Sequence, residues 1–354
     1  MRIDGIALRG ISTAVPCRVS RTADYAVLSE AERERFAAST GIHERRIVTD
    51  GQCASDLCAH AAEDLLARLA WNKAEVGALV MITQTGDYPV PATAIVLQHQ
   101  LGLPKTCIAF DVNLGCSSYP YGLLILSSLM KTAGIQKALL LIGDVSSRVC
   151  HPDDKSSWPL FGDAGTATAL VCDADASPMH FHLMNDGAGK EAIIIPSGGL
   201  AARQPVSADT LAVRTGDDGL PRAAVNLRLQ GADIFTFAIS KVPASLRDAL
   251  GQADWQPSDL DCVVLHQANQ MINDTIRKKV GYAPEVTHSS LASFGNTSSA
   301  SVPLTLCHAR DRLKLPARTL LAGFGVGLSW GAVTMTLPTD LVLGWVETDS
   351  VHSG

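Results

Sequence analysis

The chain lacks the features of a nucleic-acid-binding, secreted or membrane-spanning protein. Acidic side chains outnumber basic ones across the 354 residues, which gives a net charge of −6. A protein that binds nucleic acid presents a basic face to the phosphates, so this balance argues against such a partner. The first residues, Met1–Gly5, contain no apolar signal region. These absences predict a cytoplasmic protein.

The cysteines show neither a disulfide framework nor a zinc site. There are nine, an odd number, without paired spacing. Cys53 and Cys58 lie close together in the chain, but the second pair that a zinc site needs is missing. We therefore expect free thiols, and neither a metal nor another cofactor.

One stretch without charge, Thr319–Thr339, is long enough to resemble a membrane helix. It carries four glycines and ends in the β-rich run Ala332–Leu337. Two buried strands joined by a glycine turn explain this composition better than a membrane span does.

Short apolar runs alternate with longer helical patterns, which is typical of an α/β protein. The expected strands are Ala78–Ile82, Cys107–Val112, Ala138–Ile142, Ala167–Val171, Ala192–Ile195, Cys262–Leu265 and Thr319–Ala322. The expected helices are Ser55–Leu69, Ser117–Ala133, Leu229–Leu250, Met271–Val280 and Ser298–Leu313. With about 47% apolar residues, the chain is long enough for two structural halves, which we place at 1–177 and 178–354.

The two halves follow one plan, which predicts a duplicated fold. In each half a strand is followed by a Gly-X turn, then by a helix with proline in its first turns, and then by a strand that ends in glycine. From Cys116 to Gly143 is 27 positions, and from Asn296 to Gly323 is also 27. A pseudo-dyad that relates the halves would bring Cys116 and Asn296 near each other.

Three reactive side chains occupy the key places of this plan. Cys116 precedes an apolar helix, whose free first-turn amides and dipole are expected to lower the cysteine pKa. His266 ends an apolar strand, where sheets of this kind expose catalytic groups. Taken singly, these residues also fit a buried free thiol, a core histidine and, for Asn296, a helix N-cap. Together they predict a thiol nucleophile with donors for developing negative charge.

The glycine run Gly323–Gly327 permits close approach of the main chain to a bound carbonyl. We expect the amides of Val326 and Cys116 to form an oxyanion hole.

Seven motifs in order resemble the β-ketoacyl-acyl carrier protein synthase III family of the thiolase superfamily over essentially the whole chain. They are Ser39–Arg46, Gln84–Tyr88, Phe110–Ser117, Phe161–Gly165, His266–Asn269, Phe294–Pro303 and Gly323–Trp330. The resemblance implies a thiolase-like five-layered αβαβα fold built from two duplicated halves, a homodimer, and acyl carrier protein as a partner. It also implies a ping-pong reaction in which Cys116 takes an acyl group from a thioester. His266 and Asn296 would then donate hydrogen bonds to a malonyl thioester that loses carbon dioxide.

Several positions depart from the family pattern for coenzyme A. Members that use this donor commonly carry Trp at the place of Phe36, Arg at the place of Ser39, and Arg where Lys155 aligns. The aromatic and guanidinium groups of those members sandwich adenine, which Phe36 and Lys155 would stack less well. The resemblance thus leaves coenzyme A and a carrier protein open as the donor.

Two further regions bear on the substrates. Arg277, Lys278 and Lys279 form a basic patch for a carrier protein or simply a solvated helix end. Val90 aligns near a pocket position that is Phe in acetyl-preferring members, which suggests room for a longer or branched acyl chain.

Two other functions remain open on the same scaffold. One is an acyltransferase that moves an acyl group to a small acceptor without condensation, and such relatives usually lose or alter the asparagine. The other is a non-catalytic partner subunit, which normally lacks the nucleophile. Asn296 and Cys116 favour the condensing enzyme.

Overall fold

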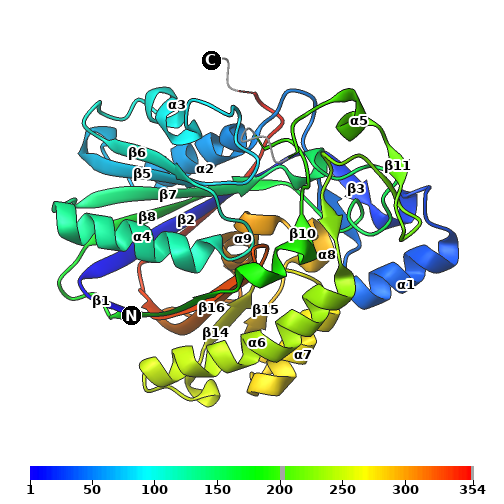
Figure 1. The fold of residues 1–354 in the computed structure, drawn as a ribbon. Coiled ribbons are helices and arrows are strands. Elements are labelled where there is room, and N and C mark those ends of the chain that lie inside the picture. Colours follow the sequence, from blue (N-terminus) through cyan, green and yellow to red (C-terminus); the bar gives the residue numbers. More distant parts are fainter. Residues whose placement is uncertain (200–203, 352–354) are drawn as a thin grey trace.

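The computed structural model describes residues 1–199 and 204–351. It contains two six-stranded sheets with helices outside and between them (Figure 1). The first sheet has the order β18 (Val342–Glu347), β2 (Ile6–Val15), β8 (Ala164–Cys172), β7 (Lys137–Asp144), β5 (Val76–Ile82) and β6 (Ile108–Val112). The second has the order β1 (Arg2–Ile3), β9 (Met179–Asn185), β17 (Ser329–Leu337), β16 (Ala317–Gly325), β14 (Cys262–Leu265) and β15 (Thr287–His288).

The remaining elements are helices and short ribbons. The α-helices are α1 (Glu30–Thr40), α2 (Ala54–Arg68), α3 (Thr93–Gln100), α4 (Ser118–Ala133), α5 (Ala208–Leu211), α6 (Gly231–Gln252), α7 (Gln270–Val280), α8 (Leu291–Phe294) and α9 (Ser301–His308). Short 3-10 helices span Thr22–Asp24, Lys73–Glu75, Ser146–Arg148, Gly187–Ala192, Pro257–Asp259, Pro284–Val286 and Ser298–Ala300. Three two-stranded ribbons pair β3 (Val19–Arg21) with β4 (Glu44–Arg46), β10 (Ile193–Ile194) with β13 (Arg228–Leu229), and β11 (Arg214–Thr215) with β12 (Pro221–Arg222).

Alternation of side chains along the buried strands produces the layers. On β7, Leu140 and Ile142 face a central core that also contains Leu321 and Val333 of the second sheet. Their neighbour Leu141 faces the opposite way, into a core shared with α2. Because both faces of each sheet are covered, the strands are apolar on both sides and form continuous hydrophobic runs.

The helices complete five layers. Helices α2 and α3 contact the outer face of the first sheet, α6 contacts the outer face of the second and packs on α7, and α4 and α9 contact both sheets from between them. This is the expected α/β arrangement of thiolase-like layers.

The internal repeat is visible in the strand order. The central strands β2, β8, β7, β5 and β6 correspond in place to β9, β17, β16, β14 and β15, with the same parallel and antiparallel pairings. The outermost strands are exchanged. β1, at the start of the chain, completes the second sheet, and β18, near its end, completes the first.

The proposed boundary at 177/178 lies between β8 and β9, where the chain passes from one sheet to the other. The exchange of β1 and β18 means that neither segment contains a whole sheet, and the boundary stays a prediction. Residues 200–203, in the second half, lie outside the described residues.

The charge-free stretch forms two strands, as predicted. β16 and β17 pair antiparallel from Ala317↔Leu337 to Gly325↔Ser329, and the glycine-bearing turn joins them. Among the described residues, no helix is both long enough and apolar enough to cross a membrane. All nine cysteines are described, and each is a free thiol.

Candidate active site

Cys116 lies in the turn between β6 and α4, at the start of a buried helix. The Ser118 amide donates to the Gly115 carbonyl at 2.9 Å, which closes the turn, and Pro120 occupies the first turn of α4. Proline is accepted there because first-turn amides have no intrahelical partner. A Cβ on Gly115 would come within 2.6 Å of Val326 Cγ1 and 2.4 Å of Gln84 Oε1, so a side chain at this position would require Val326 and Gln84 to move.

The expected depression of the Cys116 pKa is wrong. Burial raises the pKa of this thiol to about 11, and the charge of Asp144 adds to the increase. Hydrogen bonds from the Val326 and Cys116 amides and from Ser298 lower the pKa, but desolvation of the buried thiolate outweighs them. The resting nucleophile is therefore a thiol at neutral pH.

His266 follows β14 and continues its pairing with β16. Its amide donates to the Ala322 carbonyl at 2.7 Å, and its Nδ1 lies 2.7 Å from Ser301 Oγ on α9. Burial lowers the pKa of His266 to about 3, so the ring is neutral at pH 7. When Ser301 donates to Nδ1, the hydrogen resides on Nε2, and His266 acts as a neutral donor.

Asn296 is fixed by main-chain bonds on both sides. Its amide donates to the Leu160 carbonyl at 2.9 Å, and its carbonyl accepts from the Gly162 amide at 3.0 Å. Its side-chain Oδ1 accepts from the Ser298 amide at 2.9 Å. With the oxygen engaged, Nδ2 is the end of the carboxamide that can donate to a ligand.

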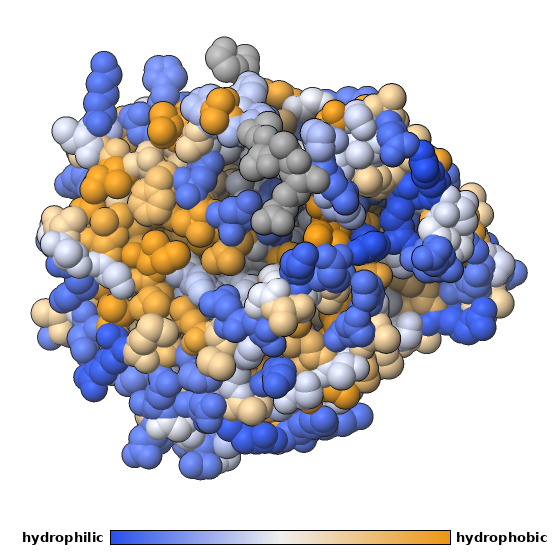
Figure 2. All heavy atoms as spheres, viewed as in Figure 1, coloured by the Kyte–Doolittle hydropathy of each residue, from blue (hydrophilic) through white to orange (hydrophobic). Residues whose placement is uncertain are grey.

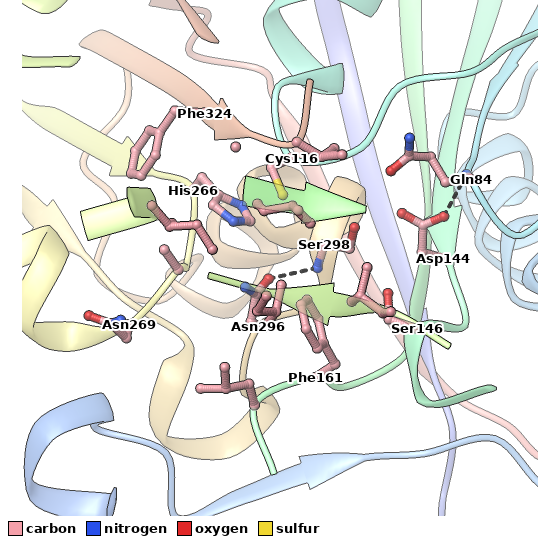
Figure 3. A pocket seen from close by; sticks show the side chains of 18 of the residues that line it. Gln84, Cys116, Asp144, Ser146, Phe161, His266, Asn269, Asn296, Ser298 and Phe324 are labelled. Atoms are coloured by element: carbon pink, nitrogen blue, oxygen red, sulfur yellow. Dashed lines mark hydrogen bonds between the residues drawn. The ribbon is translucent and has the colours of Figure 1, made fainter. Parts of the chain in front are cut away.

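Cys116, His266 and Asn296 line one cavity of about 190 Å³. Figure 3 draws Cys116, His266, Asn296 and Ser298 around this cavity, with Asn296 and Ser298 below the other two in this view. The structure thus brings together the three side chains that lie far apart in the sequence. The cavity is otherwise lined mainly by apolar side chains, among them Leu160, Phe161, Ile193, Leu229 and Phe237.

Strand β16 lies directly against the nucleophile. A Cβ on Gly325 would come within 2.7 Å of Cys116 Sγ, and one on Gly323 would come within 2.5 Å of the Cys116 carbonyl oxygen. These glycines let the strand bring the Val326 amide to the sulfur, where it already donates a hydrogen bond. The amides of Cys116 and Val326 both donate toward the sulfur, and their role as an oxyanion hole for an acyl group stays a prediction.

The residues expected to bind substrate are not all at the cavity. Phe36 is half-buried on α1, and Lys155 Nζ lies 3.0 Å from Glu32 Oε1 of the same helix. Neither lines the cavity, although Ser156 beside Lys155 does. Val90 is 78% exposed and lies outside the cavity of its own chain.

Helix α7 begins at the cavity and ends at the basic patch. Asn269 and Ile272 line the cavity, and the Asn269 side chain caps the helix by accepting from the Ile272 amide at 2.8 Å. Arg277 is engaged by the Tyr282 carbonyl at 3.2 Å, whereas Lys278 is exposed. The expected binding roles of Arg277 and Lys278 stay predictions.

Sequence reasoning missed the residues that support this site. Ser298 donates toward the Cys116 sulfur, Ser301 orients His266, and Phe324 meets the His266 ring edge-on at a centroid distance of 5.5 Å. All three lie inside motifs recognised in the sequence, but only the fold shows which side chains they contact. Within the described residues, no group of three or more His, Cys, Asp or Glu side chains is placed to hold a metal ion.

Two family models match this chain. The model for 3-oxoacyl-[acyl-carrier-protein] synthase III matches residues 110–187, and that for the C-terminal part of the same enzyme matches residues 250–337. The first match includes Cys116, and the second includes His266 and Asn296.

Full-length relatives give the same result. The chain is 33% identical to a β-ketoacyl-[acyl-carrier-protein] synthase III of Rhodopirellula baltica over 93% of this chain and 97% of that one. It is 32% identical to one of Streptomyces coelicolor over 94% and 97%. Among solved structures, a 3-oxoacyl-(acyl-carrier protein) synthase from Burkholderia xenovorans superposes with a TM-score of 0.91 at 33% identity, covering 98% of each chain.

Proposed function

The chain belongs to the β-ketoacyl-acyl carrier protein synthase III family of condensing acyltransferases, and from this premise we propose the roles of its residues. Cys116 attacks the carbonyl of an acyl thioester and becomes acylated, and the thiol proton leaves with the displaced carrier thiol. The observation that supports this most is the placing of sulfur, imidazole and carboxamide on one cavity, with two amides directed at the sulfur.

In the second half-reaction, a malonyl thioester occupies the cavity beside the acylated Cys116. Loss of carbon dioxide leaves an enolate, whose carbon attacks the acyl carbonyl and expels the cysteine thiolate. His266 Nε2 and Asn296 Nδ2 donate to the enolate oxygen, and these bonds strengthen as charge develops. The neutral state of His266 suits this role because its proton stays on the ring as a donor. The reaction as proposed needs no metal or prosthetic group.

A mutant pair tests this division of roles. Cys116→Ala is expected to abolish acylation, measured by intact mass after incubation with an acyl thioester. Asn296→Ala is expected to acylate normally but to lose condensation by on the order of 10²–10³-fold, measured as carbon dioxide released from malonyl carrier protein. Equal loss of acylation in both variants would refute the assignment. Acyl transfer to a small acceptor without carbon dioxide release would instead identify the non-condensing acyltransferase.

We propose a carrier-protein thioester as the acyl donor. The Lys155 ammonium is paired with Glu32, and the Ser39 hydroxyl donates to the Phe36 carbonyl at 3.1 Å, so neither is disposed as a dedicated phosphate contact. The same acyl group presented on acyl carrier protein and on coenzyme A should acylate Cys116 faster from the protein. Faster acylation from coenzyme A would refute this choice.

We further propose that the enzyme is a homodimer joined through the edge of the first sheet. β6 is the last strand of that sheet, with unpaired main-chain groups along one side, and Ile108 on it is 41% exposed. Apolar side chains also gather over the part of the surface where β6 and α4 lie (Figure 2). Since Val90 lies outside the cavity of its own chain, any influence on acyl length requires its approach from a second copy.

The pathway served by this condensation, in fatty-acid or secondary metabolism, follows from the acyl group that it accepts. A panel of acetyl through decanoyl donors tests the expectation that chains longer than acetyl are used. Strict acetyl preference would contradict the inference drawn from Val90.

A further inference from the structure

One wall of the cavity is polar and takes no part in the proposed chemistry. Gln84, Thr85, Asp144 and Ser146 line it, and all four come from the first half of the chain. Figure 3 shows Gln84, Asp144 and Ser146 together on one side of Cys116, whereas His266 and Phe324 lie on the other.

The Asp144 carboxylate accepts hydrogen bonds from several neighbouring protein groups, mainly through one of its two oxygens. Its Oδ1 accepts from the Gln84 amide at 2.8 Å and from the Thr83 and Thr85 hydroxyls at 3.1 and 3.2 Å. Its Oδ2 has only a long contact of 3.3 Å with the Ser299 amide. Asp144 is 1% exposed and forms no ion pair with a described residue.

Two further groups on this wall have unused hydrogen-bonding capacity. Within the described part of the chain, the Ser146 hydroxyl has no protein partner, although the residue is only 5% exposed. The Gln84 carboxamide is held by donation of its Nε2 to Asn113 Oδ1 at 3.1 Å. That contact leaves Gln84 Oε1 as an acceptor beside Gly115, next to the nucleophile.

The wall therefore offers acceptors in excess of donors. Asp144 Oδ2 and Gln84 Oε1 can only accept, and the Ser146 hydroxyl can do both. An all-carbon acyl chain against this wall would displace water and leave these groups without partners, which is unfavourable. A chain that ends in a carboxylate would in addition be repelled by Asp144.

We propose that the acyl group accepted by Cys116 carries a hydrogen-bond donor, a hydroxyl or an amino group, which binds at Ser146, Gln84 and Asp144. The inference rests on the proposed acylation of Cys116 and names the class of its substrate. Sites built to hydrogen-bond a substrate group discriminate strongly against analogues that lack it, because their own polar groups are then left unpaired.

Matched acyl groups on one carrier test this proposal. Butanoyl, 3-hydroxybutanoyl, 4-hydroxybutanoyl, 4-aminobutanoyl and succinyl thioesters are compared by the rate of the mass increase at Cys116. At least one acyl group that carries a hydrogen-bond donor should acylate Cys116 at least about ten-fold faster than butanoyl does. Succinyl should acylate Cys116 more slowly than butanoyl. The hydroxyl and amino arms distinguish a neutral from a charged donor.

Two variants locate the preference on the polar wall. Ser146→Ala should reduce the ratio of the preferred rate to the butanoyl rate by about ten-fold, because it removes the free hydroxyl. Ser156→Ala is the matched control. Ser156 also lines the cavity, but its hydroxyl already donates to Asp154 at 2.6 Å, so the ratio should not change.

The outcomes separate this inference from the proposed function. If butanoyl loads as fast as every donor-bearing group, the inference fails and the acylation of Cys116 stands. A preference that survives unchanged in Ser146→Ala overturns the assignment to this wall. If no thioester acylates Cys116, both proposals fail.

Discussion

Two opposing effects set the pKa of Cys116. Burial raises it and keeps the side chain a thiol, whereas three hydrogen-bond donors around the sulfur lower it. Burial disfavours the thiolate, whereas the Val326 and Cys116 amides and the Ser298 hydroxyl stabilise it. In the proposed mechanism, the Val326 and Cys116 amides would donate instead to the acyl oxygen once the sulfur is acylated. A high resting pKa also protects the thiol from oxidants, which attack thiolates.

The reactivity of Cys116 should therefore depend on pH over an unusually alkaline range. Its alkylation by iodoacetamide is expected to accelerate past pH 9 with a midpoint near 11, since the pKa is raised to about 11 and only the thiolate reacts. The rate is measured by peptide mass at each pH. For a small-molecule thiol with a pKa of about 8.5 in the same buffers, the alkylation rate should level off at a lower pH. A plateau for Cys116 below pH 8 would contradict this expectation.

A pair of serines provides the control for this profile. Ser298→Ala should move the midpoint to still higher pH, because the hydroxyl of Ser298 lowers the pKa of Cys116. The neighbouring Ser299 hydroxyl is buried without a hydrogen-bond partner in the described structure, so Ser299→Ala should leave the midpoint in place.

The sequence predicted three residues that line one cavity in the fold, but it did not predict the ionisation of the cysteine. Cys116, His266 and Asn296 were recognisable from residue type and from position at strand ends and turns. The helix-dipole argument gave the wrong sign for the cysteine because it used only local structure. The burial that dominates this pKa comes in part from β16, whose Gly325 packs against the sulfur and lies more than 200 residues away along the chain.

Among the elements, β16 makes a close main-chain contact with Cys116, and its glycines Gly323 and Gly325 permit that contact. Gly323→Ala would place a Cβ 2.5 Å from the Cys116 carbonyl oxygen and 2.7 Å from Ser117 Cα, and neither main-chain atom can move freely. We expect a loss of unfolding free energy of about 1–3 kcal/mol, measured by urea denaturation, together with slower acylation.

Gly251→Ala is the matched control for this change. Gly251 lies in α6 with no atom within 4 Å of the added Cβ, and alanine is the better helix former by about 1 kcal/mol. This variant should be at least as stable as the wild type. Equal effects of the two substitutions would show that close packing on the nucleophile is not what requires Gly323.

The elements themselves were predictable to different degrees. Several elements lie within two residues of their predicted bounds at both ends. Among them are the strands β5, β7 and β14 and the helices α2, α4 and α6. The helix expected over Ser298–Leu313 is shorter, because a 3-10 turn spans Ser298–Ala300 and α9 ends at His308. Ser298 has a φ of 49°, a left-handed conformation that a propensity argument does not foresee for serine.

On the scale of the whole molecule, an exposed sheet edge is the surface that a second copy would cover. Ile108→Lys on β6 should shift the protein toward the monomer, because burying an unpaired ammonium in the interface is unfavourable. Light scattering coupled to size exclusion measures the mass. Val213→Lys introduces the same charge at a 54% exposed residue next to β11, far from β6 in Figure 1. The interface assignment fails if both variants have the same mass.

The sequence predicts the duplication of the fold from two equal spacings. In both halves, 27 positions separate the residue in the turn (Cys116 or Asn296) from the glycine in the next strand (Gly143 or Gly323). The exchange of the outermost strands was not. β1 has only two residues and β18 only six, and such short segments carry no signal of which sheet they will join. Their partners are fixed by tertiary contacts alone.

That exchange couples assembly of the molecule to its synthesis. A ribosome delivers β2, β8, β7, β5 and β6 early, yet the first sheet stays open at one edge until residues 342–347 emerge. Cutting the chain at 177/178 would leave each fragment without one strand of its sheet. Separately translated fragments would therefore have to associate, with β1 of the first joining the second sheet and β18 of the second joining the first.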